Sequence, residues 1–128
     1  MIEIARHSPD NGIFQKDIAK AQDISNKYLD HIIHSLKVAG LITNVKGKKS
    51  GYMLTRPADR ITVFDIHRAF EPGICVIDCL SNNYQCDREE GCSARGFWGK
   101  LNQQIIEHFK SVSLQDLVEN KLVLDDAI

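Results

Sequence analysis

The stretch from residue 25 to residue 54 carries a helix signal directly followed by a hairpin signal, and this order constrains the fold most. Apolar side chains recur there at the spacing of one helix face, at Tyr28, Leu29, Ile32, Ile33 and Leu36. Ser25 stands just before them and can cap the helix, because its hydroxyl can accept a hydrogen bond from an N–H group of the first turn. Gly40 follows as a natural helix stop.

Two short strand-like runs come next, at residues 41–45 and 52–54. Residues 46–51 between them carry two glycines and three lysines, which predicts a hairpin with a longer loop. Before the helix that Ser25 caps we expect a helix tail at residues 2–6, a turn, and a shorter helix over residues 14–21. The order helix, turn, helix, two-stranded ribbon is that of a winged helix-turn-helix, so we predict a mainly α fold with a small β-hairpin wing.

A winged helix can meet DNA through two features, and both have candidate residues here. The N-terminal residues of the second helix face base edges in the major groove, and the wing tip can lie against phosphates or enter a minor groove. The expected DNA contacts are Ser25, Asn26, Lys27, Tyr28, Lys37, Lys46, Lys48 and Lys49. Tyr28 is also expected to lie partly in the core. The alternative is a winged helix that contacts another protein, since a fold does not fix a function.

The formal net charge of −1 argues by itself against nucleic acid, but the charges are unevenly divided. Residues 13–60 hold nine Lys or Arg and four acids, a net +5, whereas residues 61–128 hold six and eleven, a net −5. The basic half can meet phosphates while the acidic half faces elsewhere. The 128 residues contain no apolar run of membrane-spanning length and no signal-peptide pattern, so we expect a cytoplasmic protein with no membrane partner.

The acidic half is expected to contain two short helices and one long helix. Thr62 with Asp65, and Ser113 with Asp116, have the spacing of a capping box. Residues 94–111 between them predict the long helix, whose apolar stripe is Phe97, Leu101, Ile105 and Phe109. A helix with one apolar face needs a partner surface.

Four cysteines precede this helix, at Cys75, Cys79, Cys86 and Cys92. In a cytosolic protein such a cluster indicates metal binding or redox chemistry more often than a structural disulfide. Cys75 stands between two apolar residues and is expected to be a buried packing residue, whereas the other three lie in polar sequence and are the candidate ligands. Thiolates suit an iron–sulfur cluster or zinc, although the paired CxxC motifs of a zinc ribbon are absent. A disulfide switch and an unmetallated thiol loop remain alternatives.

Several motifs resemble those of the Rrf2 family of bacterial winged-helix regulators. They are ISNKYL at 24–29, LKVAGLI at 36–42, VKGKKSGYML at 45–54, ITVFDI at 61–66 and SLQDL at 113–117. The resemblance covers nearly the whole chain and implies a homodimer built on the long helix. It also implies an iron–sulfur cluster (2Fe–2S or 4Fe–4S), whose three cysteine ligands match Cys79, Cys86 and Cys92, and which shifts the choice of DNA sites.

Two departures from the family pattern concern this cluster. Six residues separate Cys79 from Cys86, where members of this kind have five. Arg95 stands three residues after Cys92, where some members have a histidine ligand. Other members take the fourth ligand from an acid at the beginning of the first helix of the partner subunit, and we expect this chain to enter that helix late.

These observations predict three segments. Residues 1–71 form a DNA-binding winged helix-turn-helix with a truncated first helix, residues 72–93 a cysteine-containing sensor loop, and residues 94–128 a dimerisation helix with a short C-terminal helix. The expected function is a dimeric DNA-binding transcription regulator that senses redox state, nitric oxide or iron–sulfur status. The alternative is a metal- or thiol-redox-binding interaction module that does not bind DNA. No His or acid is placed in the sequence to pair with a cysteine, so an enzyme is not expected.

Overall fold

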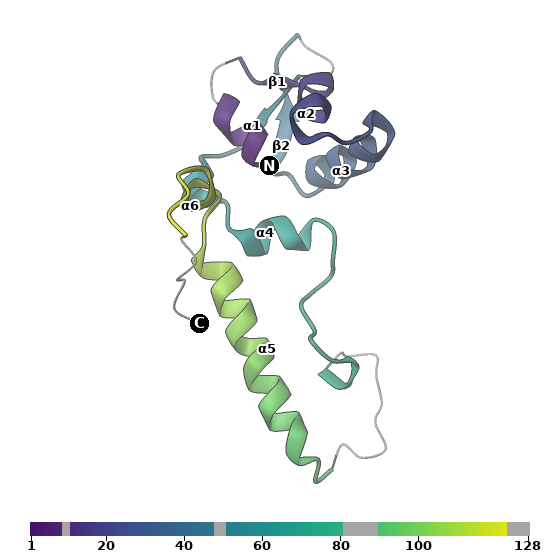
Figure 1. The fold of residues 1–128 in the computed structure, drawn as a ribbon, viewed down its shortest axis with the longest axis vertical. Helices are drawn as coiled ribbons and strands as arrows, with labels where there is room; N and C mark the ends of the chain where they lie inside the picture. The colour runs from purple at the N-terminus through teal and green to yellow at the C-terminus, as the bar shows by residue number, and fades with distance from the viewer. Residues whose placement is uncertain (9–10, 48–50, 81–89, 123–128) are drawn as a thin grey trace.

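A computed structural model describes residues 1–8, 11–47, 51–80 and 90–122 of the chain. It consists of a head, built mainly from the first half of the chain, and a long helix that projects away from this head (Figure 1). The head begins with α1 (Ile2–His7), α2 (Gln15–Gln22) and α3 (Asn26–Val38). The later elements are the 3₁₀ turn η1 (Ala58–Arg60), α4 (Val63–Arg68), the turn η2 (Asp78–Leu80), α5 (Ser93–Ser111) and α6 (Leu114–Val118). The expected mainly α fold with a small β wing is confirmed.

A small antiparallel sheet carries the wing. β2 (Ile42–Asn44) and β3 (Gly51–Leu54) form the expected hairpin. A third strand, β1 (Ile13–Phe14), pairs with the other edge of β3, so β3 is the central strand. The expectation of a helix from residue 14 is therefore wrong by one residue: Phe14 pairs with Gly51, and α2 begins at Gln15. A strand of two residues has no alternation, so no sequence pattern indicates it.

Local hydrogen bonds fix both ends of α3, as the sequence predicts. Ser25 Oγ accepts a hydrogen bond of 3.1 Å from the N–H of Tyr28 and caps the first turn. At the other end Gly40 adopts a φ of +75°, which lets the chain leave the helix. The N–H of Leu41 then donates to the carbonyl of Leu36 at 3.0 Å, so this carbonyl in the last turn of the helix has a hydrogen-bond partner.

The hydrophobic core of the head includes residues from both halves of the chain. Its buried members are Ile4, Ile13, Ile18, Ala19, Leu29, Ile33, Leu36, Leu41, Ile42, Tyr52, Leu54, Ile61 and Leu114. Ile61 and Leu114 are both 0% exposed, and the N–H of Leu114 donates to the carbonyl of Ile61 at 2.7 Å. The chain beyond α5 therefore returns to the head, where α6 packs against α1 and η1 (Figure 1).

Both expected capping boxes are present. In α4, Thr62 Oγ1 accepts from the N–H of Asp65, and Asp65 Oδ2 accepts from the N–H of Thr62, each at 3.0 Å. Ser113 and Asp116 repeat this arrangement at the start of α6. Burial acts to raise the pKa of Asp65, but the bonds from Thr62 and the Arg56 guanidinium outweigh it and hold this pKa below its usual value. Thr62 and Ser113 also form a β-bridge, so the starts of α4 and α6 lie side by side.

The expected long helix is confirmed as α5, which begins one residue earlier, at Ser93. Its last turns contact α4: the rings of Phe109 and His67 meet edge-on with centroids 5.6 Å apart, and Lys110 Nζ lies 4.7 Å from the centroid of Phe64. The structure describes α5 in full, and none of its residues is buried. Within the described parts of the chain, no helix combines the length and the apolar character needed to cross a membrane.

Candidate nucleic-acid interface and cysteine loop

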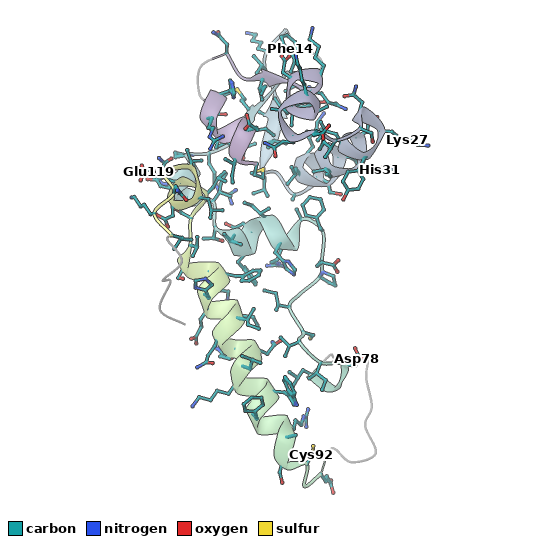
Figure 2. All side chains as sticks on the ribbon, viewed as in Figure 1. Phe14, Lys27, His31, Asp78, Cys92 and Glu119 are labelled. Atoms are coloured by element: carbon teal, nitrogen blue, oxygen red, sulfur yellow. The ribbon has the colours of Figure 1, made fainter. Side chains whose placement is uncertain are left out.

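The first turn of α3 presents exposed polar side chains at one end of the head. Asn26 and Lys27 are exposed, and Lys27 extends away from the head (Figure 2). Tyr28 is 60% exposed, which is more than the sequence predicts for a residue partly in the core. Ser25 is exposed as well, but its oxygen already accepts the capping hydrogen bond, so the hydroxyl hydrogen remains for a further contact.

Lys37 lies at the opposite end of α3 and is turned toward the sheet. Its Nζ donates to Asn44 Oδ1 at 2.7 Å and lies 5.9 Å from the centroid of the Tyr52 ring. The ammonium group therefore links α3 to β2 and β3. It has three donors, so a phosphate contact would share this group with Asn44.

The wing is described up to the beginning of its tip. The N–H of Val45 donates to the carbonyl of Gly51 at 2.8 Å, which closes the base of the hairpin. Lys46 follows and is exposed. Lys48 and Lys49 lie outside the residues that the structure describes. The wing is thus anchored to the central strand of the sheet, and its first lysine faces solvent.

Gln15, which the sequence does not mark as functional, joins its own helix α2 to α3 and to β3. Its Nε2 donates to the carboxylate of Asp30 and, at 3.4 Å, to the carbonyl of Asn26, both on α3. Its Oε1 accepts from the hydroxyl of Tyr52 on β3 at 3.3 Å. These partners are between 11 and 37 residues away in the chain, so no local pattern could have revealed them.

The cysteine loop is described in part. Cys92 is exposed, takes no part in a disulfide and is the residue just before α5. Cys75 is also exposed, so the expectation that it is a buried packing residue is wrong. The side chain of Cys79 and the whole of Cys86 lie outside the described residues.

The exposure of Cys75 has a physical reason in the contacts of its neighbours with α5. Asn102 Oδ1 accepts from the N–H of Val76 at 2.8 Å, and Asn102 Nδ2 donates to the carbonyl of Ile74 at 2.9 Å. The backbone on both sides of Cys75 is thus bound to the side of α5, away from the core of the head. Because Cys92 is the residue just before α5, both ends of the cysteine loop are attached to this one helix.

The donor chemistry of the loop suits an iron–sulfur cluster. The exposed thiol of Cys92 can supply a soft thiolate ligand, and Cys79 and Cys86 offer two more in the sequence. Within the described residues, no three His, Cys, Asp or Glu side chains form a group that could hold a metal. Arg95 lies in the first turn of α5, and a guanidinium cannot ligate iron. The structure places only the Cys92 thiol of the three candidate ligands, and its donor type is one that an iron–sulfur cluster takes.

The three helices and the β2–β3 hairpin of the head place this molecule in the class of winged-helix proteins. The model of the family Rrf2, described as "Iron-dependent Transcriptional regulator", matches residues 1–120. The chain therefore belongs to the Rrf2 family, as its sequence motifs predict.

Two similar proteins extend over almost the whole chain. The transcriptional regulator IscR of Xenorhabdus nematophila is 32% identical over 127 residues, which cover 99% of this chain and 77% of IscR. The protein rrf2 of Nitratidesulfovibrio vulgaris is 33% identical over 120 residues, which cover 94% of this chain and 80% of that protein.

Solved structures show the same fold. CymR, the global cysteine regulator of B. subtilis, superposes with a TM-score of 0.78 at 28% identity, covering 93% of this chain and 87% of CymR. IscR of T. potens superposes with a TM-score of 0.71 at 28% identity, covering 94% of this chain and 79% of that IscR chain. The chain is accordingly a DNA-binding transcription regulator, and the expectation that it is not an enzyme is confirmed by these relatives.

Proposed function

We propose that this chain acts as a homodimeric, sequence-specific regulator whose cysteine loop senses redox state, nitric oxide or iron–sulfur status. The observation that carries the DNA-reading part is the exposed first turn of α3, where Asn26 and Lys27 face solvent. An α-helix fits the major groove, and side chains of this kind pair with base edges. Such a regulator works where the chromosome is, in the cytoplasm.

The proposed DNA contacts fall into two groups, which correspond to the recognition helix and the wing of a winged helix. Base edges are read from the start of α3, and phosphates are contacted by the wing. The proposed contacts are Ser25, Asn26, Lys27 and Tyr28 for bases, and Lys37, Lys46, Lys48 and Lys49 for phosphates. The net charge of +5 over residues 13–60 supports this assignment, because it concentrates positive potential on the part of the chain that forms α2, α3 and the wing.

The wing lysines provide the direct test of DNA binding. Replacing Lys48 and Lys49 by Ala should weaken binding to the duplex upstream of the chain's own gene. It should also lower the slope of log K against log salt by about 2, one unit for each lost phosphate contact. Lys100→Ala, an exposed lysine on α5, is the control and should change neither quantity. Unchanged affinity of the double variant across the salt series would contradict the wing assignment.

We propose that Cys79, Cys86 and Cys92 hold the sensing group. The family description as iron-dependent supports an iron–sulfur cluster, which would supply an iron centre that reacts with oxidants or nitric oxide. A purely thiol-based sensor is the second candidate, because Cys75 and Cys92 are both exposed and one of the similar structures is an oxidised form of CymR from Staphylococcus aureus. That chain superposes with a TM-score of 0.74 at 27% identity.

Anaerobic purification separates these two candidates. With a cluster, the wild-type chain should be coloured and should contain iron and sulfide, whereas Cys79→Ser, Cys86→Ser and Cys92→Ser should each lose the visible spectrum. Cys75→Ser is the matched control and should keep it. A colourless, iron-free wild-type chain that cannot be reconstituted would exclude the cluster and leave thiol oxidation as the sensing chemistry.

The proposed dimer rests on the apolar face of α5. Phe97 on this helix is 64% exposed, and none of the other residues of α5 is buried in the single chain. A second apolar surface is open as well: a groove of about 830 Å³ between α1, α3, α4 and α6, with Ile32, Ile66 and Phe70 in its lining. The exposed apolar side of α5 supports association with a second copy through this helix.

A further inference from the structure

The side chain of Gln15 has its hydrogen-bonding capacity almost filled within the head. A glutamine amide offers two N–H donors and one acceptor oxygen. Here the donors face the carboxylate of Asp30 and the carbonyl of Asn26, and the oxygen accepts from the hydroxyl of Tyr52. No N–H of this amide remains to read a base edge, so its action on DNA would be indirect.

The partners of Gln15 belong to the two features that meet DNA. Asn26 and Asp30 lie in the first half of α3, the helix proposed to read bases. Tyr52 lies on β3, the central strand, which leads directly out of the wing tip. Gln15 therefore connects the start of the recognition helix to the strand that carries the wing.

Tyr52 is a firm anchor for this connection. It is 6% exposed and belongs to the hydrophobic core, so its position is set by packing. Burial, and then the negative charge of Asp30, raise the pKa of Tyr52 above its ordinary value, and its hydroxyl donates to Gln15 Oε1. The same ring lies under the ammonium of Lys37, which stands at the other end of α3. This ammonium also donates a hydrogen bond to Asn44 on β2. The recognition helix is thus tied to the sheet at both ends.

We propose that Gln15 is a positioning residue for DNA reading, which sets the start of α3 relative to the wing through Asp30, Asn26 and Tyr52. This inference rests on the proposed role of α3 in reading bases. Sequence-specific binding requires that α3 reach the base edges while the wing rests on the backbone, so a shift between them costs specific contacts. Contacts to phosphates alone tolerate such a shift, because phosphates repeat along the duplex.

The test compares two glutamines of α2. Gln15→Met keeps the length of the side chain and removes all its hydrogen bonds. Gln22→Met is the matched control, because Gln22 Nε2 donates at 3.1 Å to the carboxylate of Glu3 on α1, and within the described part of the chain its amide bonds neither α3 nor the wing. The wild-type chain is first used to enrich bound sequences from a randomised duplex library. Affinities are then measured for the enriched duplex and for a duplex of shuffled sequence.

For Gln15→Met we expect a loss of affinity of roughly fivefold to tenfold on the enriched duplex, the size of one or two net hydrogen bonds. Its affinity for the shuffled duplex, and the salt dependence on both duplexes, should stay unchanged. Gln22→Met should bind both duplexes as the wild type does. Tyr52→Phe should reproduce part of the loss, and the double variant with Gln15→Met should be no weaker than Gln15→Met alone, since the two residues act through one bond.

Two results would overturn the role of Gln15. The Gln15→Met variant could keep the wild-type preference for the enriched duplex. Alternatively, its affinity could fall equally for both duplexes, which would indicate a phosphate contact or a loss of folding. Thermal unfolding separates the latter two, and Tyr52→Phe provides a milder variant if Gln15→Met unfolds. If the wild-type chain enriches no sequence, the proposed sequence-specific function itself fails, and the role of Gln15 fails with it.

Discussion

Gly12 and Gly40 share a backbone conformation but are needed for different reasons. Their φ angles are +68° and +75°, in the left-handed region that favours glycine. A Cβ atom on Gly40 would meet nothing within 4 Å. On Gly12 it would lie 2.7 Å from the carbonyl oxygen of Tyr52 and would overlap a methyl group of Val45. Gly12 is therefore also required by the close packing of its turn against the base of the wing.

Gly12→Ala should therefore destabilise the fold more than Gly40→Ala. The left-handed conformation costs an L-residue about 1–2 kcal/mol, which applies to both variants. Overpacking should add about 1–3 kcal/mol at Gly12 alone. Urea unfolding of the two variants, at equal protein concentration, measures the difference. Equal losses of unfolding free energy would contradict the close contact between this turn and β3.

Single residues were predictable from the sequence where their partners are near in the chain. The caps of Ser25, Thr62 and Ser113 could be predicted because each bonds a group three residues away. Gln15 and Cys75 show the opposite case. The partners of Gln15 are distant in sequence, and the exposure of Cys75 depends on hydrogen bonds that its neighbours make to α5.

Among the elements, α6 has a larger structural role than its length suggests. The capping box predicts a short helix there, and the sequence groups it with the long helix before it. The structure packs α6 against α1 and η1, with Leu114 completely buried. Because Leu114 also bonds the backbone of Ile61, the chain on both sides of α5 is joined to the head.

Leu114→Ala should destabilise the head by about 2–5 kcal/mol, since it removes a fully buried leucine from a packed core. Leu122→Ala is the control: Leu122 is 50% exposed, so the change there should stay within about 0.5 kcal/mol. Chemical unfolding at a fixed protein concentration reports both values. If Leu114→Ala unfolds at the same urea concentration as the control, α6 does not contribute to the core.

The whole molecule separates a basic head from a long helix with an unburied apolar face. The head contains the exposed start of α3. The cysteine loop is attached to α5 at two residues, Asn102 and Ser93. Since α5 also contacts α4 through Phe109 and Lys110, one helix touches both the loop and the head. In a dimer built on α5, a change in the loop would act directly on the element that sets the distance between two heads.

Leu101→Asp should convert the proposed dimer to a monomer, because it places a charge in the apolar stripe of α5. Gln104→Asp introduces the same charge at an exposed position of the helix and should leave the dimer intact. Sedimentation equilibrium distinguishes the two masses, and unfolding by circular dichroism checks that both variants remain folded. A wild-type chain that is monomeric at high concentration would contradict the dimer before any variant is made.

The sequence by itself determined the order of the helices and the wing, the caps of α3, α4 and α6, and the family. These features rest on periodicity and on hydrogen bonds between close neighbours, which a linear pattern records. Only the tertiary structure decided the third strand, the return of α6 to the core, the exposure of Cys75 and the network around Gln15. Each of these depends on groups that are far apart in the chain and meet only after the core has packed.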